Sequence, residues 1–163
     1  MKSTEDIVNR QRQLCAFMVD RYCFGIDVLQ VQEVLRFQEM TRVPLAPPLV
    51  RGLINLRGQI VMAIDLRRRL ELPERPDGQL PINVVVRTAD GVISFLVDEL
   101  RDVMHVPDVA LEEPPDTMTC LERALITGCY KLKGQLLLVL DTEKVADIVQ
   151  CVGESLEESS DSS

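Results

Sequence analysis

Short apolar runs separated by turns and prolines occupy most of the chain, and this pattern predicts β structure rather than long helices. Two of the runs are apolar at every position instead of at alternate positions. Both faces of such a strand must be covered, so we expect these two strands, Ile60–Ile64 and Leu136–Leu140, to lie where two barrels pack together. The other runs interpreted as strands are Cys15–Val19, Phe24–Val28, Ile82–Val86 and Val92–Val97.

The chain contains two copies of one short block. Each copy reads Gly, three residues, Leu, a basic residue, Gly-Gln, five apolar residues and Asp. The residues that are identical in the two copies are Gly52/Gly128, Leu56/Leu132, Gly58/Gly134, Gln59/Gln135 and Asp65/Asp141. A weaker echo precedes each block, in Val28–Val34 and Val97–Val103, and each echo is followed by a Val-Pro pair and then by a double proline. Because these features keep their order, we interpret the chain as two copies of one small unit.

Each block predicts a tight turn and the start of a helix. Gly58 and Gly134 suit a hairpin turn that needs a positive φ. Asp65 and Asp141 suit helix N-caps, with a short helix after Asp65 and a longer one over Asp141–Val152. The predicted fold class is therefore all-β (mainly β): two packed five-stranded β-barrel subdomains, a short connecting helix and a C-terminal helix.

The domain is expected to span residues 14–152. Residues 73–81 are rich in proline and polar residues and are interpreted as a linker, so that one subdomain covers about 14–79 and the other about 80–152. Each half is close to the lower size limit for a self-sufficient core. We therefore expect the halves to pack into one cooperative body.

The two ends of the chain are set apart from this domain. Residues 1–13 are treated as an N-terminal segment. Residues 153–163 carry four acidic residues and no basic ones, which predicts a disordered acidic tail.

Composition excludes several function classes. The 26 acidic residues outnumber the 18 basic ones and give a net charge of −8, whereas a nucleic-acid binder usually has the opposite bias. The longest apolar run, Leu14–Val19, is far shorter than the roughly 20 residues of a membrane-spanning helix. The N-terminus has no apolar signal region. We expect a cytoplasmic protein that binds no nucleic acid and does not insert into a membrane.

Side chains that perform chemistry are few and scattered. The five cysteines form no Cys-x-x-Cys pair and His105 is the only histidine, so neither a zinc site nor a two-histidine metal site is expected. Motifs for a serine nucleophile, a phosphate-binding loop or a metalloprotease are absent from the sequence. We predict no catalysis, no cofactor and no metal. A small-ligand-binding β-barrel protein, which would use the cleft between the halves, stays open as an alternative.

One ordered series of motifs resembles the CheW family, the coupling proteins of bacterial chemosensory arrays. The resemblance runs from about Leu14 to Val149 and is carried by Phe24–Val34, Thr41–Pro47, Arg51–Gly58 and Ile64–Arg67. It implies two SH3-like barrels packed side by side and a scaffold without catalysis. The implied partners are a CheA-type histidine autokinase, through its CheW-like regulatory domain, and the cytoplasmic tips of methyl-accepting receptors. These partners place the protein at the inner face of the membrane, in an array for swimming or in a gliding, twitching or other chemosensory system.

The resemblance also implies which residues bind these partners. The candidate receptor- and kinase-binding residues are Val31, Glu33, Gly52 and Arg57 in the first copy and Leu100 and Val103 in the second. The residues alone allow plainer interpretations. Arg57, like its counterpart Lys133, is an ordinary polar turn residue; the three apolar candidates suit a core; and Gly52 is required if a side chain there would meet the opposite barrel.

Two further interpretations concern single positions. The run Arg67-Arg68-Arg69 lies between Leu66 and Leu70 and is read as the solvent-facing side of a short helix. Met62 stands where the CheW family usually has proline. An edge proline blocks strand addition, so Met62 raises the question of how that edge is protected.

Overall fold

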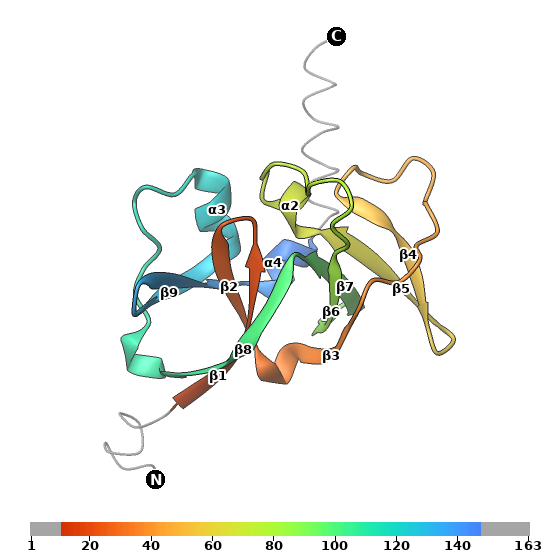
Figure 1. Ribbon diagram of the computed structural model, residues 1–163. Coiled ribbons are helices and arrows are strands. Elements are labelled where there is room, and N and C mark those ends of the chain that lie inside the picture. Colours follow the sequence, from red (N-terminus) through yellow and green to blue (C-terminus); the bar gives the residue numbers. More distant parts are fainter. Residues whose placement is uncertain (1–10, 148–163) are drawn as a thin grey trace.

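The structure, a computed structural model, describes residues 11–147 (Figure 1). The strands in this part of the chain are β1 (Gln11–Val19), β2 (Tyr22–Asp27), β3 (Val31–Leu35), β4 (Val50–Leu56), β5 (Gln59–Asp65), β6 (Ile82–Thr88), β7 (Gly91–Val97), β8 (Glu99–Pro107), β9 (Ile126–Leu132) and β10 (Gln135–Leu140). Three short α-helices, α2 (Leu66–Arg69), α3 (Cys120–Leu125) and α4 (Thr142–Ala146), and two 3₁₀ turns, η1 (Val28–Gln30) and η2 (Asp108–Ala110), join them. The mainly β fold is confirmed.

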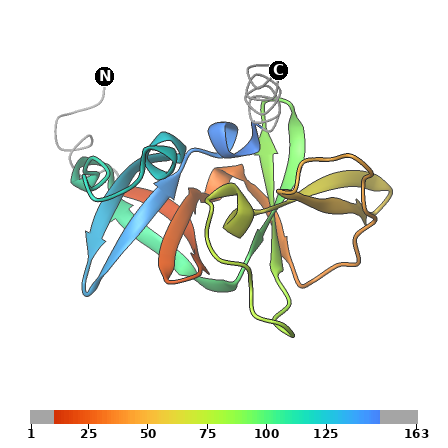
Figure 2. The same ribbon diagram turned by 90° about the horizontal axis from the view of Figure 1, so that it is seen from above.

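The strands form two five-stranded sheets that lie side by side (Figures 1 and 2). Sheet A has the order β8-β1-β2-β10-β9, and sheet B has the order β3-β6-β7-β5-β4. The two orders match strand by strand, and matching strands are five places apart in the chain: β3 corresponds to β8, β6 to β1, β7 to β2, β5 to β10 and β4 to β9. The internal repeat is therefore a repeat of folded structure.

The division of the two subdomains at residues 14–79 and 80–152 is wrong. Hairpin β1–β2 pairs with β8 and, in parallel, with β10, whereas hairpin β6–β7 pairs with β3 and, in parallel, with β5. Each half of the chain thus gives one hairpin to the other half's sheet. The apolar pattern of a strand specifies which faces are buried but not which strand lies next to it, so the sequence could not reveal this exchange.

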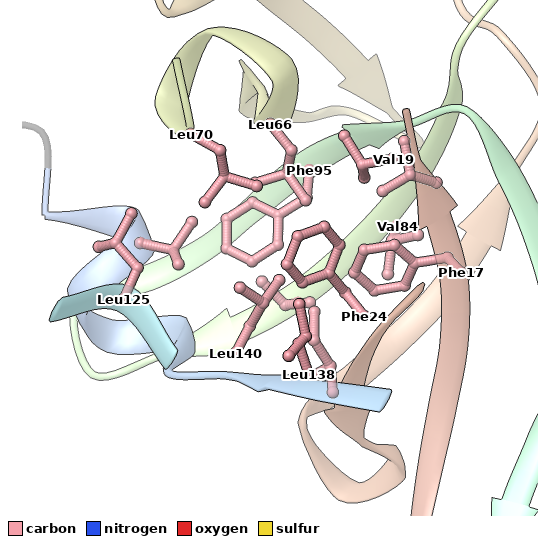
Figure 3. Close-up of a cluster of buried hydrophobic side chains, with 14 of the residues drawn as sticks. Phe17, Val19, Phe24, Leu66, Leu70, Val84, Phe95, Leu125, Leu138 and Leu140 are labelled. Carbon is pink, nitrogen blue, oxygen red and sulfur yellow. The ribbon is translucent and has the colours of Figure 1, made fainter. Parts of the chain in front are cut away.

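A single large apolar core joins the two sheets (Figure 3). Phe17 and Phe24 from sheet A meet Phe95 from sheet B there, and all three are at most 2% exposed. A smaller core, which includes Tyr130, lies on the other face of sheet A. The contacts of the large core support the expectation of one cooperative body.

Strand β10 separates the two cores, as its continuous apolar pattern predicted. Leu137 and Val139 point into the small core, and Leu138 and Leu140 point into the large one. The prediction is wrong only at the start of this strand, where Leu136 is 39% exposed. Its counterpart Ile60 on β5 is 61% exposed, and both residues stand two positions after the glycine of a hairpin turn.

The expected helix starts are confirmed. Asp65 Oδ1 accepts a hydrogen bond from the Arg67 N–H at 3.0 Å, and Asp141 Oδ1 accepts one from the Lys144 N–H at 3.2 Å. Helix α4 ends at Ala146 with Asp147 as its C-cap, so the helix predicted over 141–152 is interrupted there, and residues 148–152 lie outside the described residues. The expected acidic tail, residues 153–163, also lies outside them, and β1 begins within the segment set apart as 1–13.

The basic run in α2 does not face solvent as expected. Arg67 is 6% exposed and its guanidinium binds Asp98 in two ways, with Nη2 at 2.6 Å from Oδ2 and Nε at 3.0 Å from Oδ1. Arg75 Nε donates to the same carboxylate at 2.9 Å, and its Nη2 lies 3.6 Å from Asp65 Oδ1. The Asp20 N–H donates to Asp98 Oδ2 at 2.6 Å. This group of charges ties the segment 73–81 to both sheets.

Arg69 is buried for a different reason. Its guanidinium donates to the carbonyl oxygens of Val145 at 3.0 Å and Lys144 at 2.9 Å, in the last turn of α4. A cation at a helix C-terminus satisfies carbonyls that lack partners within the helix. Arg68 is the least buried of the three, with 31% of its side chain exposed.

Candidate functional site

The candidate site of sheet B centres on the turn between β4 and β5. Arg57 and Gly58 form a two-residue hairpin loop, with φ of 51° and 88°. Positive φ at both central residues is the mark of a type I′ turn, whose twist matches that of the strands. The Asn55 side chain accepts the Gly58 N–H at 2.9 Å and fixes the loop. Arg57 is therefore presented on a rigid turn.

Arg57 is paired with Glu33, another of the predicted residues. Its Nη1 lies 3.0 Å from Glu33 Oε2 on β3, with side-chain exposures of 80% for Arg57 and 19% for Glu33. Because Glu33 is mostly covered, the pair leaves the guanidinium outermost. In the described part of the chain the counterpart Lys133 has no ion pair. The two turns therefore differ, which supports a specific role for Arg57.

Val31 begins β3, two residues before Glu33. It is half-buried and packs against the large core. The structure therefore brings Val31, Glu33 and Arg57 into one region of sheet B. Val31 contributes mostly to the core, and Glu33 and Arg57 make up the polar surface.

Gly52 is a buried residue of β4. A Cβ atom built there would lie 2.6 Å from the backbone oxygen of Thr41, which is held against Leu53 by hydrogen bonds of 2.9 and 2.8 Å. The collision is with the β3–β4 loop of the same sheet, so the expectation of a clash with the opposite barrel is wrong. Gly128 repeats the arrangement with the oxygen of Glu112, also at 2.6 Å.

Replacing Gly52 with Ala is expected to lower the free energy of unfolding by about 2 kcal/mol, because the Thr41 backbone must move and weaken its hydrogen bonds. Urea denaturation measures the effect. Gly134→Ala is the control: its Cβ would meet nothing within 4 Å and only the φ of 79° opposes it, which costs about 1 kcal/mol. Equal losses in the two variants would contradict the steric explanation.

The two candidate residues of the second copy lie on β8, in sheet A. Leu100 is half-buried and packs against the large core, whereas Val103 is 48% exposed. They lie on a different sheet from the Arg57–Glu33 pair, which belongs to sheet B. β8 and its counterpart β3 each pair with one strand only, and within residues 11–147 their outer edges carry no further strand. Free strand edges can accept a partner's backbone.

Met62 does not lie on a free edge. β5 pairs with β4 on one side, where Met62 faces Leu53, and with β7 on the other, where Met62 faces Ile93. The expectation that its edge needs protection is therefore wrong. The half-buried side chain packs against the large core.

Sequence reasoning missed the apolar residues that the hairpins expose. Ile60 and Leu136, each the second residue after its turn glycine, are both well exposed, and Leu29 in η1 is 83% exposed. Ile60 and Leu136 occupy equivalent positions of the internal repeat, and this equivalence was the sequence feature that could have indicated a shared exposed position. The exposure of these two residues was missed because both strands are apolar at every position, and every position was therefore expected to be covered.

The described residues offer little reactive chemistry. They contain no group of three or more His, Cys, Asp or Glu side chains that could hold a metal ion. Burial raises the pKa of the thiols of Cys15, Cys23 and Cys129, which favours the unreactive protonated form. None of the helices within 11–147 has the length and apolarity that crossing a membrane requires.

Comparisons with known proteins agree with this architecture. Residues 7–150 match the CheW-like domain. The chain is 33% identical to a chemotaxis protein CheW of Bacillus subtilis over 135 residues, covering 83% of this chain and 86% of that protein. It is 29% identical to the CheW of Treponema pallidum over 141 residues, covering 84% and 83%.

A solved structure shares the fold. The scaffolding protein TtCheW of Thermoanaerobacter tengcongensis superposes with a TM-score of 0.76 at 24% identity, over 83% of this chain and 88% of that one. The expected pair of SH3-like barrels is thereby confirmed. From the domain match and the identity to its relatives, the chain belongs to the CheW-like domain family.

Proposed function

We propose that this chain is a non-catalytic scaffold that couples a CheA-type histidine autokinase to methyl-accepting receptors in a bacterial chemosensory array. Family membership supports the role in chemotaxis signalling. The observation that carries the finer proposal is the Arg57–Glu33 pair, which places an exposed guanidinium on the β4–β5 turn. Binding to receptor tips would hold the protein at the inner face of the membrane.

The mechanism is linkage between binding sites. A scaffold changes kinase output only if it binds the active and inactive arrangements of its partners with unequal affinity. The shared core of the two sheets suits this task, because a displacement at one sheet reaches the other through packed side chains. Several weak contacts on one body then assemble an array through multivalency.

The proposal assigns the two partners to two regions. The Arg57–Glu33 surface of sheet B, with Val31 beneath it, binds the receptor tip, where an exposed arginine can recognise a carboxylate. The free edge of β8, with Leu100 and the exposed Val103, binds the regulatory domain of the kinase. Gly52 acts indirectly, by allowing the β3–β4 loop to pack against β4.

Arg57→Glu is expected to weaken binding of a receptor-tip fragment at least tenfold and to leave the melting temperature almost unchanged. The new carboxylate would face Glu33 and lose the attraction for an acidic partner, while the turn is too exposed to affect the core. Isothermal titration calorimetry measures the affinity, and thermal melting tests the fold.

Lys133→Glu provides the matched control, with the same charge change at the equivalent turn of the second copy. It should bind the fragment like the unaltered protein. If the two variants bind equally well, the receptor assignment of Arg57 fails.

A further inference from the structure

We propose that the acidic C-terminal segment of this chain, residues 153–163, binds to a hollow rimmed by arginines on sheet B. The hollow, here called the arginine hollow, has a volume of about 400 Å³ and lies between the β3–β4 loop and α2. The loop and α2 lie on the same upper side of the molecule in Figure 1. The proposal concerns contacts within one chain and is independent of the receptor and the kinase.

The arginine hollow combines an apolar lining with a basic rim. Its apolar side chains include Phe37, Met40 and Val43 of the β3–β4 loop. Its charged lining residues are three arginines, Arg42, Arg51 and Arg68, and no acidic residue lines it. A ligand that fits this surface has negative charge around an apolar group.

The three arginines are only partly neutralised. Arg42 is exposed and has no ion pair among residues 11–147. Arg51 Nη1 lies 3.9 Å from Asp65 Oδ2, but that carboxylate also faces Arg75. Arg68 Nη2 lies 3.1 Å from Glu74 Oε1, and the Glu74 side chain is 75% exposed. The Arg68–Glu74 pair contributes little stability because Glu74 is exposed, and Arg51 shares its carboxylate with Arg75, so the rim keeps an excess of positive charge in a protein of net charge −8.

The C-terminal segment has the complementary chemistry. The stretch that follows Gly153 contains Glu154, Glu157, Glu158 and Asp161, and no lysine or arginine follows Lys144. Its only apolar residue, Leu156, stands among these acids. Leu156 can therefore enter the apolar lining while the carboxylates on either side meet the arginines.

Helix α2 connects the end of the described chain to the arginine hollow. Arg69 of α2 donates to the carbonyl oxygen of Val145 at 3.0 Å, and the residue before it, Arg68, lines the hollow, so α2 contacts both the end of the described chain and the hollow. An extended chain covers about 3.3 Å per residue, which gives residues 148–153 a reach of roughly 20 Å. A short tether also gives the segment a millimolar effective concentration, so that weak contacts suffice.

The test compares amide and arginine Nε–H NMR spectra of the full chain with those of a variant that carries Glu154→Gln, Glu157→Gln, Glu158→Gln and Asp161→Asn. Signals of the arginine hollow should shift, those of sheet A should not, and the difference should disappear near 1 M salt, where the Debye length is about 3 Å. Leu156→Ser should shift the signals of Phe37 and Met40. Unchanged signals in the first variant would overturn the proposal, and unchanged signals in the second would overturn the insertion of Leu156.

A reciprocal test changes the hollow instead of the tail. Arg42→Glu combined with Arg68→Glu should shift the signals of residues 154–161, whereas Arg101→Glu combined with Arg123→Glu, which changes the net charge equally at exposed positions elsewhere, should not. Equal shifts in both variants would overturn the proposal. Shifts that grow with protein concentration would show that the segment binds another copy and would overturn binding within the chain.

Discussion

Phe95→Ala is expected to lower the free energy of unfolding by about 3–5 kcal/mol and to do so for both sheets at once. Phe95 is fully buried on β7 and lies in the core that the two sheets share. Removing the ring leaves a cavity between Phe17, Phe24 and their neighbours, because surrounding side chains relax only in part. Both sheets therefore lose packing contacts and should be destabilised together.

The two tyrosines allow a direct measurement, since both lie in sheet A, Tyr22 on β2 and Tyr130 on β9, whereas Phe95 lies in sheet B. Urea unfolding followed by tyrosine fluorescence and by far-ultraviolet circular dichroism should show one coincident transition, shifted equally by the substitution. Ile60→Ala, at an exposed position of the same sheet, should change stability by less than about 0.5 kcal/mol. A tyrosine transition that does not move in Phe95→Ala would show that the sheets unfold independently.

Asp98→Asn is expected to cost about 3 kcal/mol at pH 7, because the change leaves Arg67 and Arg75 with too little compensating charge in a place that water barely reaches. The side chains of Asp98, Arg67 and Arg75 are only 6–7% exposed. Glu74→Gln is the control, since Glu74 pairs with Arg68 at the surface and its loss should cost less than about 1 kcal/mol.

The same carboxylate gives the stability a pH dependence. Burial by itself raises the pKa of Asp98, but the hydrogen bonds from Arg67, the Asp20 N–H and Arg75 outweigh it, so the pKa is lowered. A lowered pKa in the folded state means that this stabilisation is present above the unfolded value of about 3.9 and is lost as the pH falls through the folded value. Denaturation curves of Asp98→Asn at pH 7 and in acid should therefore lie closer together than those of the unaltered protein. If they do not, Asp98 is not the group that titrates.

Local features of the fold could be predicted from the sequence. The hairpin turns, the caps at Asp65 and Asp141 and the strand β10 depend on residues near one another in the chain, and each was confirmed. Strand β8 was missed, because most of its residues are exposed and it has no continuous apolar run. The environment of Arg67 was also missed, since its burial depends on Asp98, a residue remote in sequence.

In the candidate site too, local features could be predicted from the sequence, whereas contacts between residues remote in the chain could not. Arg57 could be placed on a turn from the glycine that follows it, and the resemblance named Glu33, but nothing in the sequence indicated that the two side chains would pair. The sequence suggested that a side chain at Gly52 would collide with a neighbour, but it named the wrong neighbour. The backbone that lies closest is that of Thr41, whose position depends on the path of a long loop. The exposed edges of β3 and β8 follow from strand order, which the apolar pattern does not encode.

The exchange of hairpins has a consequence for how the protein is made. Sheet B can be completed once synthesis has passed β7, because it uses only strands β3 to β7. Of the ten strands within residues 11–147, those of hairpin β1–β2 are translated first, yet their partners β8 and β10 are among the last three. Hairpin β1–β2 must therefore wait with unpaired strand edges until β8 and β10 are made, and chaperones have the longest time to act on it.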